Sequence, residues 1–202
     1  QTRIYLDPSG YLFDTSTATI GTLFNVTVRV RDATTEVFGF QVRMFFNNTM
    51  INVTRWFEPK WDPEYVFYGW TTLPVPTPPQ VAYDVFAPPG NASATVAVAP
   101  FPPMPEHGFT GDGLMCIIEF KITAVPPPGE TYSCDLDIDK PMTYLLDKDG
   151  NEIPGVVKEN GYYEFVSIVP KVHDVAVIDV SPSPTSVTAG EPVFIKVTVL
   201  NE

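Results

Sequence analysis

The stretch that decides the fold is Gly113–Thr123, GLMCIIEFKIT. Its side chains alternate along the chain, and those on one face are Leu114, Cys116, Ile118, Phe120 and Ile122. A period of two over this length predicts a half-buried β-strand. A second alternating run, 133–139 (SCDLDID), places Cys134 on its apolar face and three aspartates on the other. Each of the two strands is therefore expected to contribute one cysteine to the core.

The same alternation predicts strands on both sides of this pair. They are expected at residues 4–7, 23–31, 37–46, 50–54, 65–70, 81–86, 94–99, 142–146 and 162–168. In the segment 23–31 the valines face inward, while Asn25, Arg29 and Arg31 face outward. No segment combines a helical period with caps, so the chain is expected to be all-β.

One segment differs from this pattern. Residues 56–112 carry twelve prolines, which cannot donate to a β-ladder and predict loops, edges or bulges.

The C-terminal segment alternates again but is too short to fold alone. Residues 172–180 and 193–200 form two more alternating strands after a linker. About thirty residues cannot bury a core alone, so these strands must pair with something outside their own segment. We expect two domains, 1–169 and 170–202, and intersubunit contacts by Val175, Val177, Val193, Ile195, Val197 and Val199.

Composition indicates a compartment and excludes some functions. The 202 residues carry a net charge of −12 and only 12 scattered Lys and Arg, which argues against nucleic-acid binding. Asn-X-Ser/Thr sequons occur at Asn25, Asn47, Asn52 and Asn91. Together with two cysteines they favour an extracellular protein. The chain contains no membrane-spanning stretch and starts at Gln1, so we expect a mature form whose signal peptide has been removed.

Catalytic motifs are not found in the sequence. Its two histidines, His107 and His173, lie near no nucleophile motif, and neither a phosphate-binding glycine loop nor a HExxH motif occurs. A glycosidase-type carboxylate pair would be invisible in sequence. We do not expect an enzyme.

Several of these segments together resemble the cohesin family. The matching stretches are FNVTVRV (24–30), VFGFQVRMFF (37–46), GDGLMCIIEFKIT (111–123), LLDKDGNEIPGVV (145–157) and ENGYYEFVSI (159–168). The resemblance covers roughly residues 2–169 and implies a jelly-roll β-sandwich of about nine strands. The tail resembles the opening of a CARDB-type, Ig-like adhesion module, which would add two Ig-like strands.

Within a cohesin-like sandwich the two cysteine strands would lie in opposite sheets. The resemblance therefore implies a disulfide between Cys116 and Cys134 through the core, worth roughly 3 kcal/mol on the chain-entropy model. The alternative is two buried free thiols. Zinc is not expected, because two cysteines without nearby histidines make half a site.

Two acidic stretches are candidate cation sites. Asp147, Asp149 and Asn151 present oxygens at alternating positions, which suits calcium, although the spacing is not that of an EF-hand. The alternative is a polar hairpin turn. The aspartates at 135, 137 and 139 would attract a cation or a basic partner, or form a solvated face. No cofactor is required by either interpretation, and calcium is the one that the sequence allows.

Aromatic residues gather at the start of the proline-rich insertion. The candidate contact residues are Trp56, Trp61, Tyr65 and Trp70. Such residues stack on sugar rings, anchor protein interfaces or form a satellite core, and the sequence leaves all three open.

These observations lead to two hypotheses on function. The first is a non-catalytic extracellular structural or adhesion protein of a cell surface, which polymerises or docks by adding its C-terminal strands to a neighbouring copy. The second is a cohesin or carbohydrate-binding module of a longer surface scaffold, which binds a dockerin-like partner or a glycan.

Overall fold

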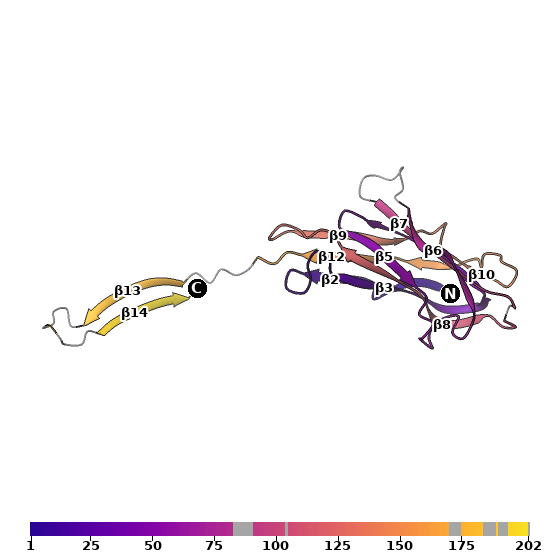
Figure 1. Cartoon of the computed structure of the whole chain (residues 1–202), viewed down its shortest axis with the longest axis horizontal. Coiled ribbons are helices and arrows are strands. Elements are labelled where there is room, and N and C mark those ends of the chain that lie inside the picture. The colour runs from indigo at the N-terminus through magenta and orange to yellow at the C-terminus, as the bar shows by residue number, and fades with distance from the viewer. Residues whose placement is uncertain (83–90, 104, 170–174, 184–188, 190–193, 202) are drawn as a thin grey trace. The chain divides into compact units, whose positions relative to one another are not determined.

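A computed structural model describes the chain except for residues 83–90, 104, 170–174, 184–188, 190–193 and 202. The chain divides into two compact units, Gln1–Ile168 and Val169–Glu202. The described residues contain β-strands and no helix (Figure 1). None of them therefore forms a helix long and apolar enough to cross a membrane.

The first unit is a sandwich of two sheets. One sheet has five strands in the order β11-β1-β3-β8-β5. Their bounds are β11 Val157–Glu159, β1 Arg3–Asp7, β3 Leu23–Val37, β8 Phe109–Ile122 and β5 Ile51–Phe57. The other sheet has seven strands, six of them in the order β2-β12-β9-β4-β7-β6, while β10 pairs with β4. Their bounds are β2 Gly10–Asp14, β12 Gly161–Val166, β9 Thr131–Ile138, β4 Gly39–Asn47, β7 Asn91–Pro100, β6 Thr72–Ala82 and β10 Tyr144–Leu146.

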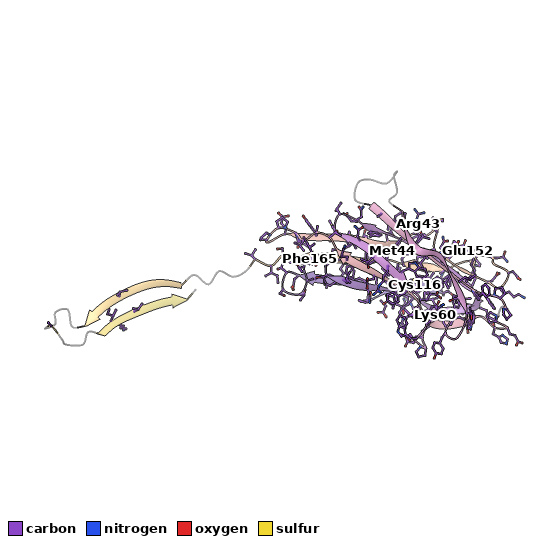
Figure 2. All side chains as sticks on the ribbon, viewed as in Figure 1. Arg43, Met44, Lys60, Cys116, Glu152 and Phe165 are labelled. Atoms are coloured by element: carbon purple, nitrogen blue, oxygen red, sulfur yellow. The ribbon has the colours of Figure 1, made fainter. Side chains whose placement is uncertain are left out.

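The N-terminal segment joins both sheets. β1 pairs with β3 and, in parallel, with β11, and after Pro8 and Ser9 the chain continues as β2, which pairs in parallel with β12. Large apolar side chains fill the space between the sheets, among them Met44, Cys116 and Phe165 (Figure 2). The predicted all-β jelly-roll sandwich is confirmed.

The deciding strand departs from strict alternation at one position. Val28 pairs with Cys116 and the next residue, Arg29, pairs with Leu114, so Met115 has no partner across the β3–β8 ladder. This β-bulge turns Met115 into the core beside Cys116. Leu114 was predicted to share the core face of Cys116. Instead, Leu114 pairs with the outward-facing Arg29 of β3. Its backbone bonds to Glu64 and Val66, in the segment that follows β5.

That segment corrects a second prediction. Residues 65–70 were expected to form a strand, but only Tyr65 makes a bridge, to Leu114, and the rest form turns. Tyr65 and Phe67 nevertheless enter the core. The predicted strand at 81–86 extends beyond the described residues, since β6 runs from Thr72 to Ala82.

The predicted disulfide between Cys116 and Cys134 is not formed. Cys116 lies on β8 and Cys134 on β9, so the cysteines do lie in opposite sheets as expected, but both are free thiols. Packed sheets stand about 10 Å apart, whereas the Cα atoms of a disulfide are about 4.4–6.8 Å apart. Two inward cysteines on facing sheets therefore do not meet unless the sheets approach more closely.

The second unit is a two-stranded sheet of β13 (Val175–Ser183) and β14 (Phe194–Asn201). The antiparallel pairing has an irregularity between Val177 and Asp179. Three apolar side chains of this hairpin are at least half exposed: Val180 at 56%, Ile195 at 64% and Val197 at 50%.

Candidate binding face

Four of the five arginines of the chain lie on one surface, the outer face of the five-stranded sheet. They are Arg3 on β1, Arg29 and Arg31 on β3, and Arg55 on β5. Strand alternation places them there, because their neighbours Ile4, Val28 and Val30 are buried. We call this surface the arginine face.

At one end of the arginine face, two arginines share one carboxylate. Arg3 donates to Glu159, and Arg31 donates to the two oxygens of Glu159 at 3.2 and 3.1 Å. The Arg31 guanidinium also stacks over the Tyr5 ring, with its central carbon 5.0 Å from the centroid. Hydrogen bonds from Arg3 and the charges of both arginines lower the pKa of Glu159. The side chains are thereby held in position although about 40% of each arginine is exposed.

Arg29 lies in the middle of the face between two carboxylates. It is bonded to Glu64 and lies 3.8 Å from Asp7, measured from Nε to Oδ2. The hydrogen bond to Glu64 raises the pKa of Arg29, which therefore keeps its charge at every accessible pH.

At the other end Arg55 donates to Glu119 at 2.8 Å. Thr54 donates to the second oxygen of Glu119 at 2.6 Å, and these hydrogen bonds lower the pKa of Glu119. Arg55 also lies over the ring of Phe57, which in turn stacks against Trp61 with centroids 5.6 Å apart. Glu119 and Phe57 face outward at neighbouring registers of β8 and β5.

Such a face has the chemistry of a protein-binding surface. Arginine and tyrosine are enriched in the residues that dominate interface energies. Ion pairs and stacking restrict these arginines before any partner arrives, which lowers the entropy lost on binding. Each guanidinium keeps donors that its intramolecular partner does not use, since it carries five N–H groups.

The outer face of the other sheet carries carboxylates on β9 and β12. Asp135 and Asp137 on β9 and Glu164 on β12 face outward there. A shallow hollow of about 400 Å³ lies among Ser133, Cys134, Asp135, Tyr162 and Glu164. Arg43 is the arginine of this sheet, and it pairs with Asp139 at 3.6 Å and lies 5.0 Å from the Phe45 centroid.

The predicted aromatic contact residues do not form one platform. Tyr65 is buried, and Trp56 and Trp70 pack against the core, so only Trp61 is exposed, at 69%. Trp70 stacks on Phe67 with centroids 5.0 Å apart, and its remaining surface lines a groove of about 300 Å³ with Phe101 and three prolines. The satellite-core interpretation therefore fits most of the cluster.

The loop considered for calcium is a tight turn. Asp147 Oδ1 accepts hydrogen bonds from the backbone N–H groups of Asp149 and Asn151, at 2.9 and 2.8 Å. These bonds lower the pKa of Asp147, with Asn151 as the main contributor. Across the described ranges, no group of three or more His, Cys, Asp or Glu side chains could hold a metal ion. Calcium binding by this loop stays a prediction.

The four sequons differ in their surroundings. Asn25 is exposed on the arginine face, whereas Asn47 and Asn52 are half-buried. Asn91 pairs with Asn47 in the β7–β4 ladder, and its side chain lies outside the described set.

The predicted intersubunit residues belong to the second unit. Val175, Val177 and Val199 lie on the paired β13 and β14 strands, Ile195 and Val197 are exposed, and Val193 lies outside the described residues.

Several solved structures share this fold. A type I cohesin–dockerin complex from Clostridium thermocellum matches with a TM-score of 0.59 at 9% identity, covering 83% of this chain and 94% of that one. The protein has a cohesin-like fold. A non-cellulosomal cohesin from the archaeon Archaeoglobus fulgidus matches with a TM-score of 0.52 at 18% identity, covering 83% of this chain and 92% of that one. The third ScaC cohesin of Acetivibrio cellulolyticus, solved with a dockerin, matches with a TM-score of 0.53 at 15% identity, covering 84% and 100%.

At these identities the likeness concerns the fold alone. No family model matches the sequence, and no curated protein matches it. The cohesin-like fold corresponds to the predicted resemblance, while the predicted CARDB-type module is not shown by these structures.

Sequence reasoning placed Arg29 and Arg31 on an outer face but did not recognise a site. Arg3, Arg31 and Glu159 meet because β1 pairs with both β3 and β11. These two pairings bring Arg31 and Glu159 together although they are more than 120 positions apart in the sequence. A usable signal was present in the sequence, since all five arginines of an otherwise acidic chain occur within the first 55 residues, and four of them lie on this face.

Proposed function

We propose that this protein is a non-catalytic, extracellular cohesin-like module that binds a protein partner through the arginine face. The observation that carries the proposal is the gathering of Arg3, Arg29, Arg31 and Arg55 on one sheet of a chain with net charge −12. Several cohesins of the same fold are solved in complex with dockerins, which supports a folded protein domain as the partner.

The chemistry of the face indicates what the partner presents. Arginine donors are best matched by carboxylates, which accept two parallel hydrogen bonds from one guanidinium. A dockerin-like domain with carboxylates around an apolar centre would exchange part of the intramolecular pairing for intermolecular pairing. Half-buried Ile117 lies between the arginine clusters and offers an apolar contact.

The test compares two arginines on opposite sheets, each of which pairs with a carboxylate and lies near an aromatic ring. Arg31 pairs with Glu159 and stacks on Tyr5 at 5.0 Å, while Arg43 pairs with Asp139 and lies 5.0 Å from the Phe45 centroid on the opposite sheet. The native partner is captured from material of the producing organism with the immobilised wild-type chain, identified, and titrated by calorimetry. We expect Arg31→Glu to weaken binding by about tenfold or more, as for an interface hot spot, and Arg43→Glu to leave it unchanged. Equal effects of both variants would overturn the assignment of the face.

A second function is favoured by one observation, the exposed Val180, Ile195 and Val197 of the hairpin. A neighbouring chain that added a strand or a sheet to this hairpin would cover them and produce a surface assembly. Negative-stain microscopy of native material tests this proposal. Fibres or lattices that are lost in an Ile195→Lys, Val197→Lys variant support it, and isolated particles at high concentration argue against it.

A further inference from the structure

Asn25 lies on the arginine face and begins the sequon Asn25-Val26-Thr27. It is exposed on β3, and its register partner on β8 is Glu119. Residues two positions apart in a strand point to the same side, so Thr27 shares the outer face with Asn25. Both side chains that define the sequon are therefore on the surface of the sheet.

The other sequons are less suited to carry a substituent. The Asn47 side-chain oxygen accepts hydrogen bonds from the backbone N–H and hydroxyl of Thr49, at 3.0 and 2.7 Å, and so closes the turn between β4 and β5. The Asn52 side-chain oxygen is buried and has no hydrogen-bond partner among the described residues. Of the three sequons with described side chains, Asn25 alone has an exposed amide.

We propose that Asn25 carries an N-linked glycan that stands on the arginine face. The Nδ2 atom of Asn25 forms a bond to the anomeric carbon of the first sugar and loses a proton. The donor is an oligosaccharide linked to a polyprenyl phosphate or diphosphate. The bond between the anomeric carbon and the phosphate oxygen breaks, and the lipid phosphate leaves with the electron pair.

The position of this glycan bears on partner binding, and this step rests on the proposed function. Glu119 lies directly across from Asn25, and Arg55 is bonded to Glu119. Arg31 is six residues further along β3, about 20 Å away at the usual rise of a strand. The glycan therefore covers the Arg55 end of the arginine face and leaves the end with Arg3, Arg31 and Glu159 open to the partner.

Glycopeptide mass spectrometry of the chain purified from its producing organism tests the modification itself. We expect the peptide with Asn25 to carry a glycan mass that both Asn25→Gln and Thr27→Ala abolish, since Thr27→Ala keeps the asparagine but breaks the sequon. Asn47→Gln is the matched control and leaves that mass in place. A native peptide in which Asn25 is found only unmodified overturns the proposal, whether or not a partner binds the face.

Binding experiments with the captured partner test the masking. In the glycosylated protein Arg31→Glu should weaken binding by about tenfold or more, while Arg55→Glu should weaken it clearly less. In the unglycosylated Asn25→Gln background, the loss caused by Arg55→Glu should become larger. Equal losses for the two arginine variants in the glycosylated protein would contradict masking while leaving the modification and the partner face intact.

Discussion

Met115 and Cys116 are consecutive along β8, and both side chains are fully buried in the core. Two neighbours in a regular strand point to opposite sides, so this relationship requires the bulge at which Met115 loses its partner on β3. Beyond the bulge the outward positions of β8 are those of Ile117, Glu119 and Lys121. The bulge thus fixes which β8 side chains reach the arginine face.

Truncation of Met115 tests this geometry. We expect Met115→Ala to lower the free energy of unfolding by about 2–5 kcal/mol, because a buried side chain is removed and leaves a cavity. Ile117→Ala is the control, since Ile117 is half-buried on the outer face, and should cost clearly less. Urea denaturation gives both values. A strand that alternated strictly through position 115 would place Met115 and Ile117 on the same outer face, and the two variants would then have similar, small costs.

The state of the two thiols gives a second prediction. The chain denatured without reductant should react with a thiol reagent at both Cys116 and Cys134, and reductant should not change the Tm. In the native state Cys134 should be alkylated before Cys116, because it is half-buried whereas Cys116 is fully buried. Burial raises the pKa of both thiols, so the native reactions should be slow at neutral pH. Denatured protein that resists alkylation until it is reduced would show that the disulfide exists after all.

The cysteines also show how far sequence patterns reach in this fold. Alternation identified the inward face of β3 and of most of β8, because apolar and polar residues alternate along a strand that is buried on one face. It failed at Met115, because a bulge inserts one residue without any local residue type that marks it. It failed again at residues 65–70, where Tyr65 and Phe67 are buried within turns that bond to β8 at Leu114.

The binding face was harder to predict from the sequence than the fold. Arg29 and Arg31 were assigned to an outer face correctly, but their partners Glu64 and Glu159 come from distant segments. β11, which carries Glu159, has three residues and was not predicted, since so short a strand has no measurable period. Long-range pairing of this kind depends on the topology of the sheets and not on local composition.

Glu159 provides a pH-dependent prediction. Its folded-state pKa lies below the ordinary value of 4.5, so its pairing with Arg3 and Arg31 stabilises the fold above that value. This stabilisation is lost as the pH falls through the lowered pKa. Glu159→Gln should therefore be less stable than wild type at pH 7 by less than about 1 kcal/mol, because the site is exposed.

Urea titrations at neutral and strongly acidic pH, in low and high salt, measure that difference. It should close on acidification and shrink in high salt, since screening weakens exposed pairs. A difference that grows as the pH falls would mean that Glu159 acts through something other than its charge.

The last prediction concerns a carboxylate beneath the loop after β5. The side chain of Glu58 is only 6% exposed, and one of its oxygens accepts hydrogen bonds from Tyr65 at 2.6 Å and from Thr72. Lys60 lies 3.4 Å from the other oxygen. Desolvation and the bond to Glu58 raise the pKa of Tyr65, which stays a neutral donor. These contacts join the beginning, the middle and the end of the segment 58–72 to one another.

A double-mutant cycle measures this coupling. Tyr65→Phe should cost about 1–3 kcal/mol, because the buried carboxylate loses a donor, and Glu58→Gln should also destabilise the fold. In the double variant the losses should be less than additive, with a coupling of about 0.5–3 kcal/mol as found for directly bonded groups. Tyr68→Phe is the control, since Tyr68 is 54% exposed and should change stability little. Additive losses would show that Tyr65 contributes through its ring in the core, beside Phe67, and not through its bond to Glu58.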